Sequence, residues 1–265
     1  MRCCAGCAAL LLVLWAAEHA RAESVTRTVA SDAHQSGRVT WHMLETPFRG
    51  DAEDYALAGG ILMGIAALST LDRSVRHVAD SSGGNWAETV SDVGHFYQRT
   101  GLTFALAGGF YAAGLVSDEP SLRRTGQEVI ESFCLSAFGS QFLKHALGRN
   151  RPAAGKGPYH FVGPNWKDVD QAFPSGDTVV AFSLSTVLAA EAKWPPATIA
   201  LYSLAAATAF QRLHRDRHWL SDTVGGAVLG TAVGLGVVCA HRRIENSRRV
   251  AVIPGPRGLG LAIGF

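Results

Sequence analysis

Three short polar segments, each beside an apolar stretch, hold the side chains best suited to chemistry. The first contains Lys144 and Arg151, which lie seven residues apart. This separation is close to two helical turns, so both cations can point the same way from one helix. Pro152 disfavours helical backbone at Arg151 and is expected to end the helix there. Basic residues at a helix end also have a purely structural use, because they interact favourably with the last carbonyl groups.

The second segment is Phe173-Pro174-Ser175-Gly176-Asp177, which precedes another apolar stretch. Ser, Gly and Asp are common residues at the start of a helix, where their simplest role is capping. The same geometry leaves backbone N–H groups free at the helix start. Together with the Ser175 hydroxyl, these groups make an anion-binding site.

The third segment runs from Arg212 to Asp222. His218 and Asp222 are spaced i and i+4, so on a helix the carboxylate can accept the imidazole N–H and leave the other ring nitrogen as a nucleophile. A structural His–Asp pair at a helix start has the same spacing. Taken together, however, the three segments supply cations, an anion cradle and an oriented imidazole, which are the groups that phosphoryl transfer requires.

The patterns Lys-x6-Arg-Pro, Pro-Ser-Gly and Arg-x5-His-x3-Asp, found here between Lys144 and Asp222, resemble the signatures of the type 2 phosphatidic acid phosphatase and vanadium haloperoxidase superfamily. The resemblance implies that His218 attacks phosphorus to form a phosphohistidine and that Asp222 orients the imidazole. It implies no metal and no cofactor for hydrolysis. It also implies that the phosphate is held by five residues: Lys144, Arg151, Ser175, Gly176 and Arg212.

Two positions depart from the family pattern. Gln211 stands where a Ser usually precedes the arginine, and Asp177 stands where the family has the His that protonates the leaving group. Holding an ordinary aspartic acid protonated at pH 7 costs about 4 kcal/mol, against under about 1 kcal/mol for a histidine. Three outcomes stay open: Asp177 is an acid with an acid-shifted optimum, the substrate is a diphosphate whose leaving group needs little protonation, or the protein is a weakened enzyme that binds phosphate esters.

Three other imidazoles, those of His145, His160 and His214, lie near motif residues in the sequence and are alternative acids. We expect them to be surface or loop residues.

Six apolar stretches must position these segments. They show no alternation with period two, so they predict helices and an all-α fold, a six-helix bundle of the phosphatidic acid phosphatase type 2 kind. A long Pro- and Gly-containing loop, Gly148–Gly176, separates the third stretch from the fourth, and loops of this length are usually functional. The stretches are Ala56–Thr70, Gly101–Val116, Val129–Leu143, Thr178–Ala192, Pro196–Phe210 and Val224–Ala240.

The two ends of the chain differ from this helical region. Arg2, the apolar run Ala8–Ala17 and the small-x-small triplet Ala20-Arg21-Ala22 predict a signal peptide over residues 1–22. A polar lead-in follows over residues 23–55, then the helical phosphatase domain over 56–245. Residues 246–265 form a tail in which two short strands around a Pro/Gly turn predict a C-terminal β-hairpin without a catalytic role.

The amino-acid composition excludes some classes of protein and of binding partner. The 265 residues are 48% hydrophobic and 17% charged, which excludes a disordered chain. With 24 Lys+Arg against 22 Asp+Glu, the chain lacks the basic field of a nucleic-acid-binding protein. Beyond the predicted signal peptide, Cys134 and Cys239 are expected to be buried thiols in apolar helices rather than a disulfide.

The apolar stretches are 15 to 17 residues long, about 22–26 Å as helix, against a hydrocarbon core of about 30 Å. If all six cross, the basic residues His241-Arg242-Arg243 favour a cytoplasmic tail. That places the motifs outside and the mature N-terminus inside, whereas a cleaved signal places that terminus outside. We favour an exported, membrane-associated protein with its site on the extracytoplasmic side, with a soluble periplasmic domain as the alternative.

The sequence therefore predicts a phosphatase that hydrolyses a phosphate monoester or diphosphate, of a lipid, an isoprenyl group or another small ester, through His218. One alternative is a vanadate-dependent haloperoxidase, because the same cradle binds vanadate. The other is a phosphate-lipid-binding membrane protein that has lost activity, for which Asp177 is the sequence support.

Overall fold

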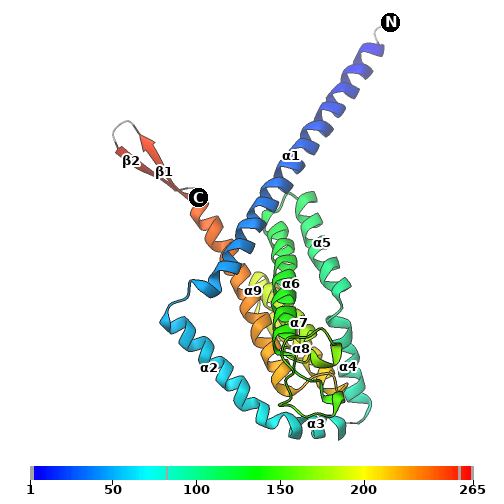
Figure 1. The fold of residues 1–265 in the computed structure, drawn as a ribbon. Coiled ribbons are helices and arrows are strands. Elements are labelled where there is room, and N and C mark those ends of the chain that lie inside the picture. The colour runs from blue at the N-terminus through cyan, green and yellow to red at the C-terminus, as the bar shows by residue number, and fades with distance from the viewer. Residues whose placement is uncertain (1–2, 82, 256–257, 264–265) are drawn as a thin grey trace.

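Four helices make up the centre of the protein: α6 (Pro120–Leu147), α7 (Gly176–Ala192), α8 (Pro195–His214) and α9 (Leu220–Arg249). In this computed structural model, which describes residues 3–81, 83–255 and 258–263, α7 packs against α6, α8 and α9 at once (Figure 1). Two further helices widen the bundle. α4 (Asn85–Tyr97) packs on α8, and α5 (Thr100–Val116) packs on α6.

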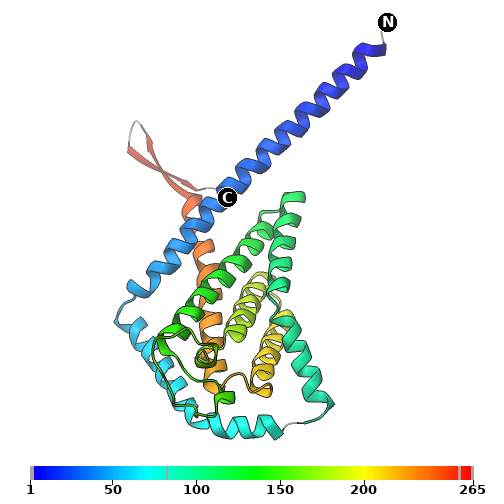
Figure 2. The same cartoon turned by 45° about the vertical axis from the view of Figure 1, so that its right-hand side comes forward.

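The remaining helices lie outside this bundle. α1 (Cys3–Glu45) is a single long helix that extends beyond it, and α2 (Ala52–Leu68) and α3 (Asp72–Ser81) run along its edge (Figure 2). The described residues thus contain nine α-helices, so the predicted count of six is wrong. The six apolar stretches correspond to α2 and α5 to α9, while α1, α3 and α4 lie outside those stretches. Short 3-10 helices cover Thr46–Phe48, Ser69–Leu71, Pro152–Ala154 and Asp168–Asp170.

The two ends of the chain carry the predicted signal peptide and the predicted C-terminal hairpin. Residues 3–22 belong to the helix α1, and cleavage of a signal peptide there stays a prediction. In the tail, β1 (Val250–Gly255) pairs antiparallel with β2 (Gly258–Ile263), which places Val250 opposite Ile263. Figure 2 shows these strands at the opposite end of the bundle from the 148–175 loop.

A row of glycines lets α7 and α9 approach closely. A Cβ atom at Gly226 would lie 2.7 Å from the Ser175 carbonyl oxygen, and one at Gly230 would lie 2.3 Å from the Val179 carbonyl oxygen. Both distances are shorter than any real contact of a Cβ atom, so only glycine fits. Gly234 continues the row with a spacing of four residues, the pattern that brings helix backbones together in membrane proteins. We call Gly226, Gly230 and Gly234 the glycine seam.

The hydrophobic core lies where α7 meets its neighbours. Ala181, Leu184 and Val187 of α7 are almost fully buried against Val129 of α6 and Ala205 of α8. Some polar groups inside it are paired, as in the 2.8 Å hydrogen bond between the Tyr97 hydroxyl and the Ser185 hydroxyl. This core fixes the relative positions of the helix ends that build the site.

Much apolar surface stays exposed on the outer helices. In α2, Leu57 is 67% exposed, Leu62 is 61% exposed and Met63 is 70% exposed. Two described segments are long and apolar enough to cross a membrane, Ala52–Ser81 and Leu220–Ser247, and only 6% of the apolar 18-residue window in the first is buried. Exposed apolar area of this extent marks a protein or membrane contact. Cys134 and Cys239 are free thiols and both are exposed, so the expectation that they are buried is wrong.

Candidate active site

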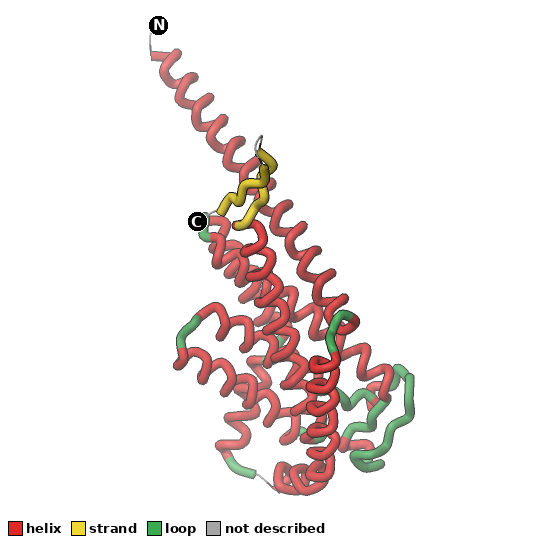
Figure 3. The backbone as a smooth tube through the Cα atoms, turned by 90° about the vertical axis from the view of Figure 1, so that its left-hand side faces the viewer, coloured by secondary structure: helices red, strands yellow, loops and turns green. Residues whose placement is uncertain are grey.

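Four parts of the chain meet at one end of the bundle. They are the C-terminal end of α6, the loop that follows it, the N-terminal end of α7, and the turn between α8 and α9. Figure 3 shows the long loop at this end of the molecule, away from the projecting part of α1. The three segments singled out in the sequence all lie here, because each one ends or begins a helix of the central group.

The first segment folds differently from the expectation. α6 ends at Leu147, and Gly148 caps it in the left-handed conformation at φ 60°. A side chain at Gly148 would place its Cβ atom 2.1 Å from the Gly163 carbonyl oxygen, so glycine is required there. Lys144 is therefore on the last turn of α6 while Arg151 is in the loop. The prediction that one helix carries both cations is wrong, because Gly148, not Pro152, ends the helix.

The imidazole of His218 is held from the α7 side. His218 is 3% exposed, and its Nδ1 lies 2.7 Å from the carbonyl oxygen of Ala172. A carbonyl oxygen only accepts hydrogen bonds, so Nδ1 carries the proton and the neutral ring keeps its lone pair on Nε2. Burial lowers the pKa of His218, while Asp222 acts in the opposite direction. The ring is thus poised as a neutral nucleophile.

Asp222 has a different position from the one predicted. His218 precedes α9 and is not part of it, so the pair does not share a helix face. The His218 Nδ1 atom lies 3.7 Å from Asp222 Oδ2, whereas this oxygen accepts a 2.8 Å hydrogen bond from the Trp219 backbone N–H. This bond is one half of a capping box, with Trp219 as the N-cap residue of α9. Ala172, not Asp222, is the hydrogen-bond partner of the imidazole, and Asp222 contributes negative charge beside it.

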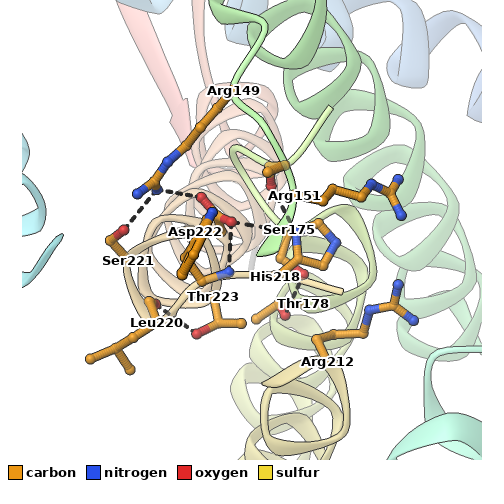
Figure 4. Close-up of polar contacts among 12 residues, drawn as sticks. Arg149, Arg151, Ser175, Thr178, Arg212, His218, Leu220, Ser221, Asp222 and Thr223 are labelled. Atoms are coloured by element: carbon orange, nitrogen blue, oxygen red, sulfur yellow. Dashed lines mark hydrogen bonds and ion pairs between the residues drawn. The ribbon is translucent and has the colours of Figure 1, made fainter. Parts of the chain in front are cut away.

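Lys144, Arg151 and Arg212 converge on the same place. A Cβ atom at Gly176 would lie 3.0 Å from Lys144 Nζ, which puts the ammonium group at the first turn of α7. Figure 4 shows the side chains of Arg151 and Arg212 extending to one side of His218. Burial, then the nearby Arg151, lowers the pKa of Lys144. Three cations brought together in this way favour the binding of an anion.

Several donors in this group are buried and unused. Among the described residues, Arg151 Nε, Arg212 Nε and Ser140 Oγ have no hydrogen-bond partner. Buried polar groups are nearly always paired, so unpaired ones call for a missing partner. Ser140 lies one turn before Lys144 on α6, and its hydroxyl would be 3.5 Å from a Cβ atom at Gly176. The sequence patterns did not include Ser140.

Ser175 and Gly176 begin α7, as predicted, but Ser175 does not cap it. Its side chain makes no capping hydrogen bond, and its hydroxyl oxygen instead accepts a 2.9 Å bond from the Thr178 hydroxyl. The Ser175 proton is therefore available to another acceptor. The Ser175 backbone N–H donates to the Asp222 carbonyl oxygen at 3.0 Å, which ties the start of α7 to the start of α9.

Two carboxylates form ion pairs with the arginines of the site. Asp177 Oδ2 lies 3.1 Å from Arg212 Nη1, and Asp168 Oδ1 lies 2.7 Å from Arg151 Nη2. The Asp177 side chain is 41% exposed and that of Asp168 is 78% exposed, so both are on the rim of the site. An incoming phosphate meets each arginine already paired with a carboxylate.

The remaining residues near the site are arranged around Arg212. Gln211 is buried, and its side-chain oxygen accepts a 3.4 Å bond from Arg212. A cavity of about 490 Å³ opens beside Arg212 and is lined from α4 by Ser91, Asp92 and His95. The His145 ring contacts the Trp166 ring at a tilt of 40°, and His214 contacts Glu88 at 3.3 Å, so these two imidazoles are engaged outside the group of cations.

Arg149 is the residue that the sequence analysis missed most clearly. It lies within the first segment, is 3% exposed, and donates to Asp222 Oδ1 at 2.5 Å and to Ser221 Oγ at 2.8 Å (Figure 4). Asp72, the first residue of α3, is fully buried and accepts from Arg149 Nη2 at 2.7 Å. The only signal in the sequence was a third basic residue between Lys144 and Arg151.

Part of the sequence matches a known family and a known protein. Residues 127–245 match the model of the PAP2 superfamily, which includes all three segments. Lipid A 1-phosphatase of Porphyromonas gingivalis is 31% identical over 104 residues, covering 37% of this chain and 23% of that protein. The chain thus spans about a quarter of the length of this relative.

Two solved structures resemble the fold. The first transmembrane PAP2-type phosphatidylglycerolphosphate phosphatase from Bacillus subtilis aligns with a TM-score of 0.56 at 18% identity, covering 72% of this chain and 96% of that one. Aquifex aeolicus LpxE aligns with a TM-score of 0.49 at 18% identity, covering 64% and 95%. The first of these establishes the likeness in fold.

Proposed function

Because this chain is a PAP2 superfamily protein over residues 127–245, we propose that it hydrolyses a phosphorylated lipid through His218. One observation carries the proposal: a neutral imidazole with a free Nε2 lies beside three cations and several buried, unpaired donors. A tetrahedral dianion is the partner that such a set lacks. The relative with lipid A 1-phosphatase activity supports a phosphorylated lipid as the substrate.

The proposed reaction has two steps. The lone pair on His218 Nε2 attacks phosphorus, the bond from phosphorus to the leaving oxygen breaks, and the leaving oxygen takes a proton. Water then attacks the phosphohistidine, the phosphorus–nitrogen bond breaks, and inorganic phosphate leaves with His218 restored. The charge that builds up on the phosphate oxygens is stabilised by Lys144, Arg151 and Arg212, by the Ser175 hydroxyl and by the Gly176 N–H. Asp222 stabilises the imidazolium form of His218.

Asp177 decides which leaving group suits the site. In the unliganded protein it is the carboxylate partner of Arg212, so it has no proton to donate until a phosphate takes its place. Once displaced, it lies beside the dianion at the start of α7, takes up a proton from water and passes this proton to an alkoxide leaving group. A diphosphate substrate avoids this requirement, because its leaving phosphate has a second pKa of about 6. Loss of turnover with retained phosphate binding is the third outcome.

Membrane association fits the same proposal. The apolar helix α2 is exposed, and the α9 segment Leu220–Ser247 is long enough to span a bilayer. We propose that the site faces the extracytoplasmic side, as the basic residues His241-Arg242-Arg243 near the C-terminal end of α9 favour. Extraction of membranes with alkaline carbonate tests the association, because a peripheral or soluble protein is released and an integral one stays in the pellet.

Turnover of a defined panel tests the activity. Purified protein in detergent is given phosphatidic acid, phosphatidylglycerol phosphate, isoprenyl diphosphate, lipid A with a 1-phosphate, and an aryl phosphate, and phosphate release is followed from acid to neutral pH. We expect release from at least one phosphorylated lipid and none from His218→Gln. Asp177→His is the matched comparison: an inactive wild type that this substitution makes active contradicts the proposal that the protein is an enzyme.

A further inference from the structure

We propose that Arg149, held by Asp72, is a positioning residue for His218. The inference rests on the proposed role of His218 as nucleophile. The bonds of Arg149 and Asp72 described below do not involve Lys144, Arg151 or Arg212, the cations that would hold phosphate. Arg149 acts through the start of α9 and through Ala172, and Asp72 acts through the start of α9. The imidazole is bonded to Ala172 and lies beside Asp222 of α9.

The Arg149 side chain uses all three of its nitrogen atoms. Nε donates to the Pro158 carbonyl oxygen at 2.8 Å, Nη1 reaches Asp222 and Ser221, and Nη2 reaches Asp72. Asp72 in turn accepts a 2.9 Å bond from the Ser221 backbone N–H and a 2.8 Å bond from the Ser221 hydroxyl. The first turn of α9 is thereby fixed between Arg149 and Asp72.

Asp222 receives its orientation from this cluster. Its Oδ1 is bound to Arg149 and its Oδ2 to the Trp219 N–H, so the carboxylate cannot rotate without breaking one of the two bonds. The second oxygen is the one that lies 3.7 Å from His218 Nδ1. Arg149 therefore determines where the negative charge beside the imidazole is placed.

A second connection runs through the backbone. The carbonyl oxygen of Arg149 accepts a 2.9 Å bond from the Ala172 N–H, and the carbonyl oxygen of Ala172 accepts the bond from His218 Nδ1. A shift of the Arg149 backbone is thus passed to Ala172, whose carbonyl oxygen in the next peptide group selects the tautomer of His218. The side-chain route and the backbone route start at the same residue.

The cluster is specific to arginine. Asp72, Asp222 and Ser221 are each at most 1% exposed, so this ion cluster is shielded from water and its geometry decides whether it is favourable. A lysine keeps the charge but offers one ammonium point in place of a planar fork. Asp72 belongs to α3, outside the residues 127–245 that match the family, so the sequence patterns give no indication of it.

The test compares Arg149→Lys and Asp72→Asn with the wild type, using the lipid from the panel that the wild type hydrolyses fastest. A displacement of about 1 Å in a reacting group costs about 100-fold in rate, so we expect kcat to fall by about 100-fold in Arg149→Lys, with KM within about 3-fold of the wild type. We expect Asp72→Asn to lower kcat as well. The fold-loss of kcat in the double variant should be smaller than the product of the two single fold-losses.

The matched control is Arg124→Lys. Arg124 is a partly buried arginine, 19% exposed, that is also bonded to several carboxylates, Glu191 at 2.7 Å and Glu245 at 3.1 Å, but it belongs to the other end of α6. We expect this variant to lower the melting temperature and leave kcat and KM unchanged. Wild-type kcat in folded Arg149→Lys and Asp72→Asn overturns the proposal, and so does an equal loss of kcat in Arg124→Lys.

A measurement without substrate separates this inference from the proposed function. In protein labelled with 15N-histidine, the ring signals of His218, assigned with His218→Gln, report which nitrogen carries the proton. We expect one tautomer, protonated at Nδ1, in the wild type and a mixture in Arg149→Lys. If the wild type hydrolyses no lipid, the proposed function fails, and an unchanged tautomer in the variant then overturns the positioning role as well.

Discussion

Replacing Asp177 by asparagine removes the negative charge that pairs with Arg212 while keeping the size and polarity of the side chain. The pair is 3.1 Å long with Asp177 41% exposed, and ion pairs of this kind are worth about 0.2–1 kcal/mol. A substrate phosphate no longer competes with this carboxylate, so we expect KM for a lipid phosphate to fall by about 1.4- to 5-fold.

The same variant separates the two roles of Asp177. An asparagine cannot give up a proton, and loss of a general acid costs about 100- to 10,000-fold in rate. We therefore expect kcat to fall strongly for phosphatidic acid, whose leaving group is an alkoxide, and to change little for isoprenyl diphosphate. Both constants are measured from phosphate release in detergent micelles over a range of substrate concentrations.

Asp168→Asn is the matched comparison, because Asp168 occupies Arg151 in the same way but is 78% exposed on the rim. We expect it to lower KM without changing kcat for either substrate. An unchanged or raised KM in Asp177→Asn for both substrates refutes the reasoning, since it means that the ion pair with Arg212 does not oppose phosphate binding.

Three further predictions concern the nucleophile, the cations and the loop. Because burial lowers the pKa of His218 below 6.5, the ring stays neutral in mild acid, and we expect kcat/KM to fall only as the pH drops through this lowered value; an acid limb above 6.5 would contradict this. Because burial lowers the pKa of Lys144 below 10.5, activity should be lost as the pH rises through the lowered value, and Lys144→Arg should move this alkaline limb upward in the same pH profile. Gly148→Ala puts a Cβ atom 2.1 Å from the Gly163 carbonyl oxygen at a φ of +60°, so it should lower the melting temperature, by about 2–4 °C for each kcal/mol lost. Gly155→Ala, at a φ of +71° with open space around it, should cost less, and equal losses would show that contact with Gly163 is not the cause.

Sequence reasoning found the groups that meet at the site but not the geometry between them. Lys144, Arg151, Arg212 and His218 were identified because chemistry restricts which residue types can hold and attack a phosphate. Their meeting at one end of the bundle follows from their places at helix ends, which apolar stretches mark well. Residue type and helix boundaries are local properties of a sequence.

The missed features depend on contacts between distant parts of the chain. Asp72 and Arg149 are 77 residues apart, and nothing in either local sequence marks them as buried partners. The spacing of His218 and Asp222 suggested a helical pair, but α9 begins only at Leu220. The imidazole therefore hydrogen-bonds to the carbonyl oxygen of Ala172 instead. The left-handed residue Gly148 was the available signal that α6 stops before Arg151.

The glycine seam limits the routes by which the proposed lipid substrate can enter the site beside His218. Backbone contact along α7 and α9 leaves no width for an acyl chain between these two helices, so they form a closed wall behind His218. Lateral entry must therefore take another direction, and the cavity next to Arg212, lined from α4 and α8, has room for a headgroup.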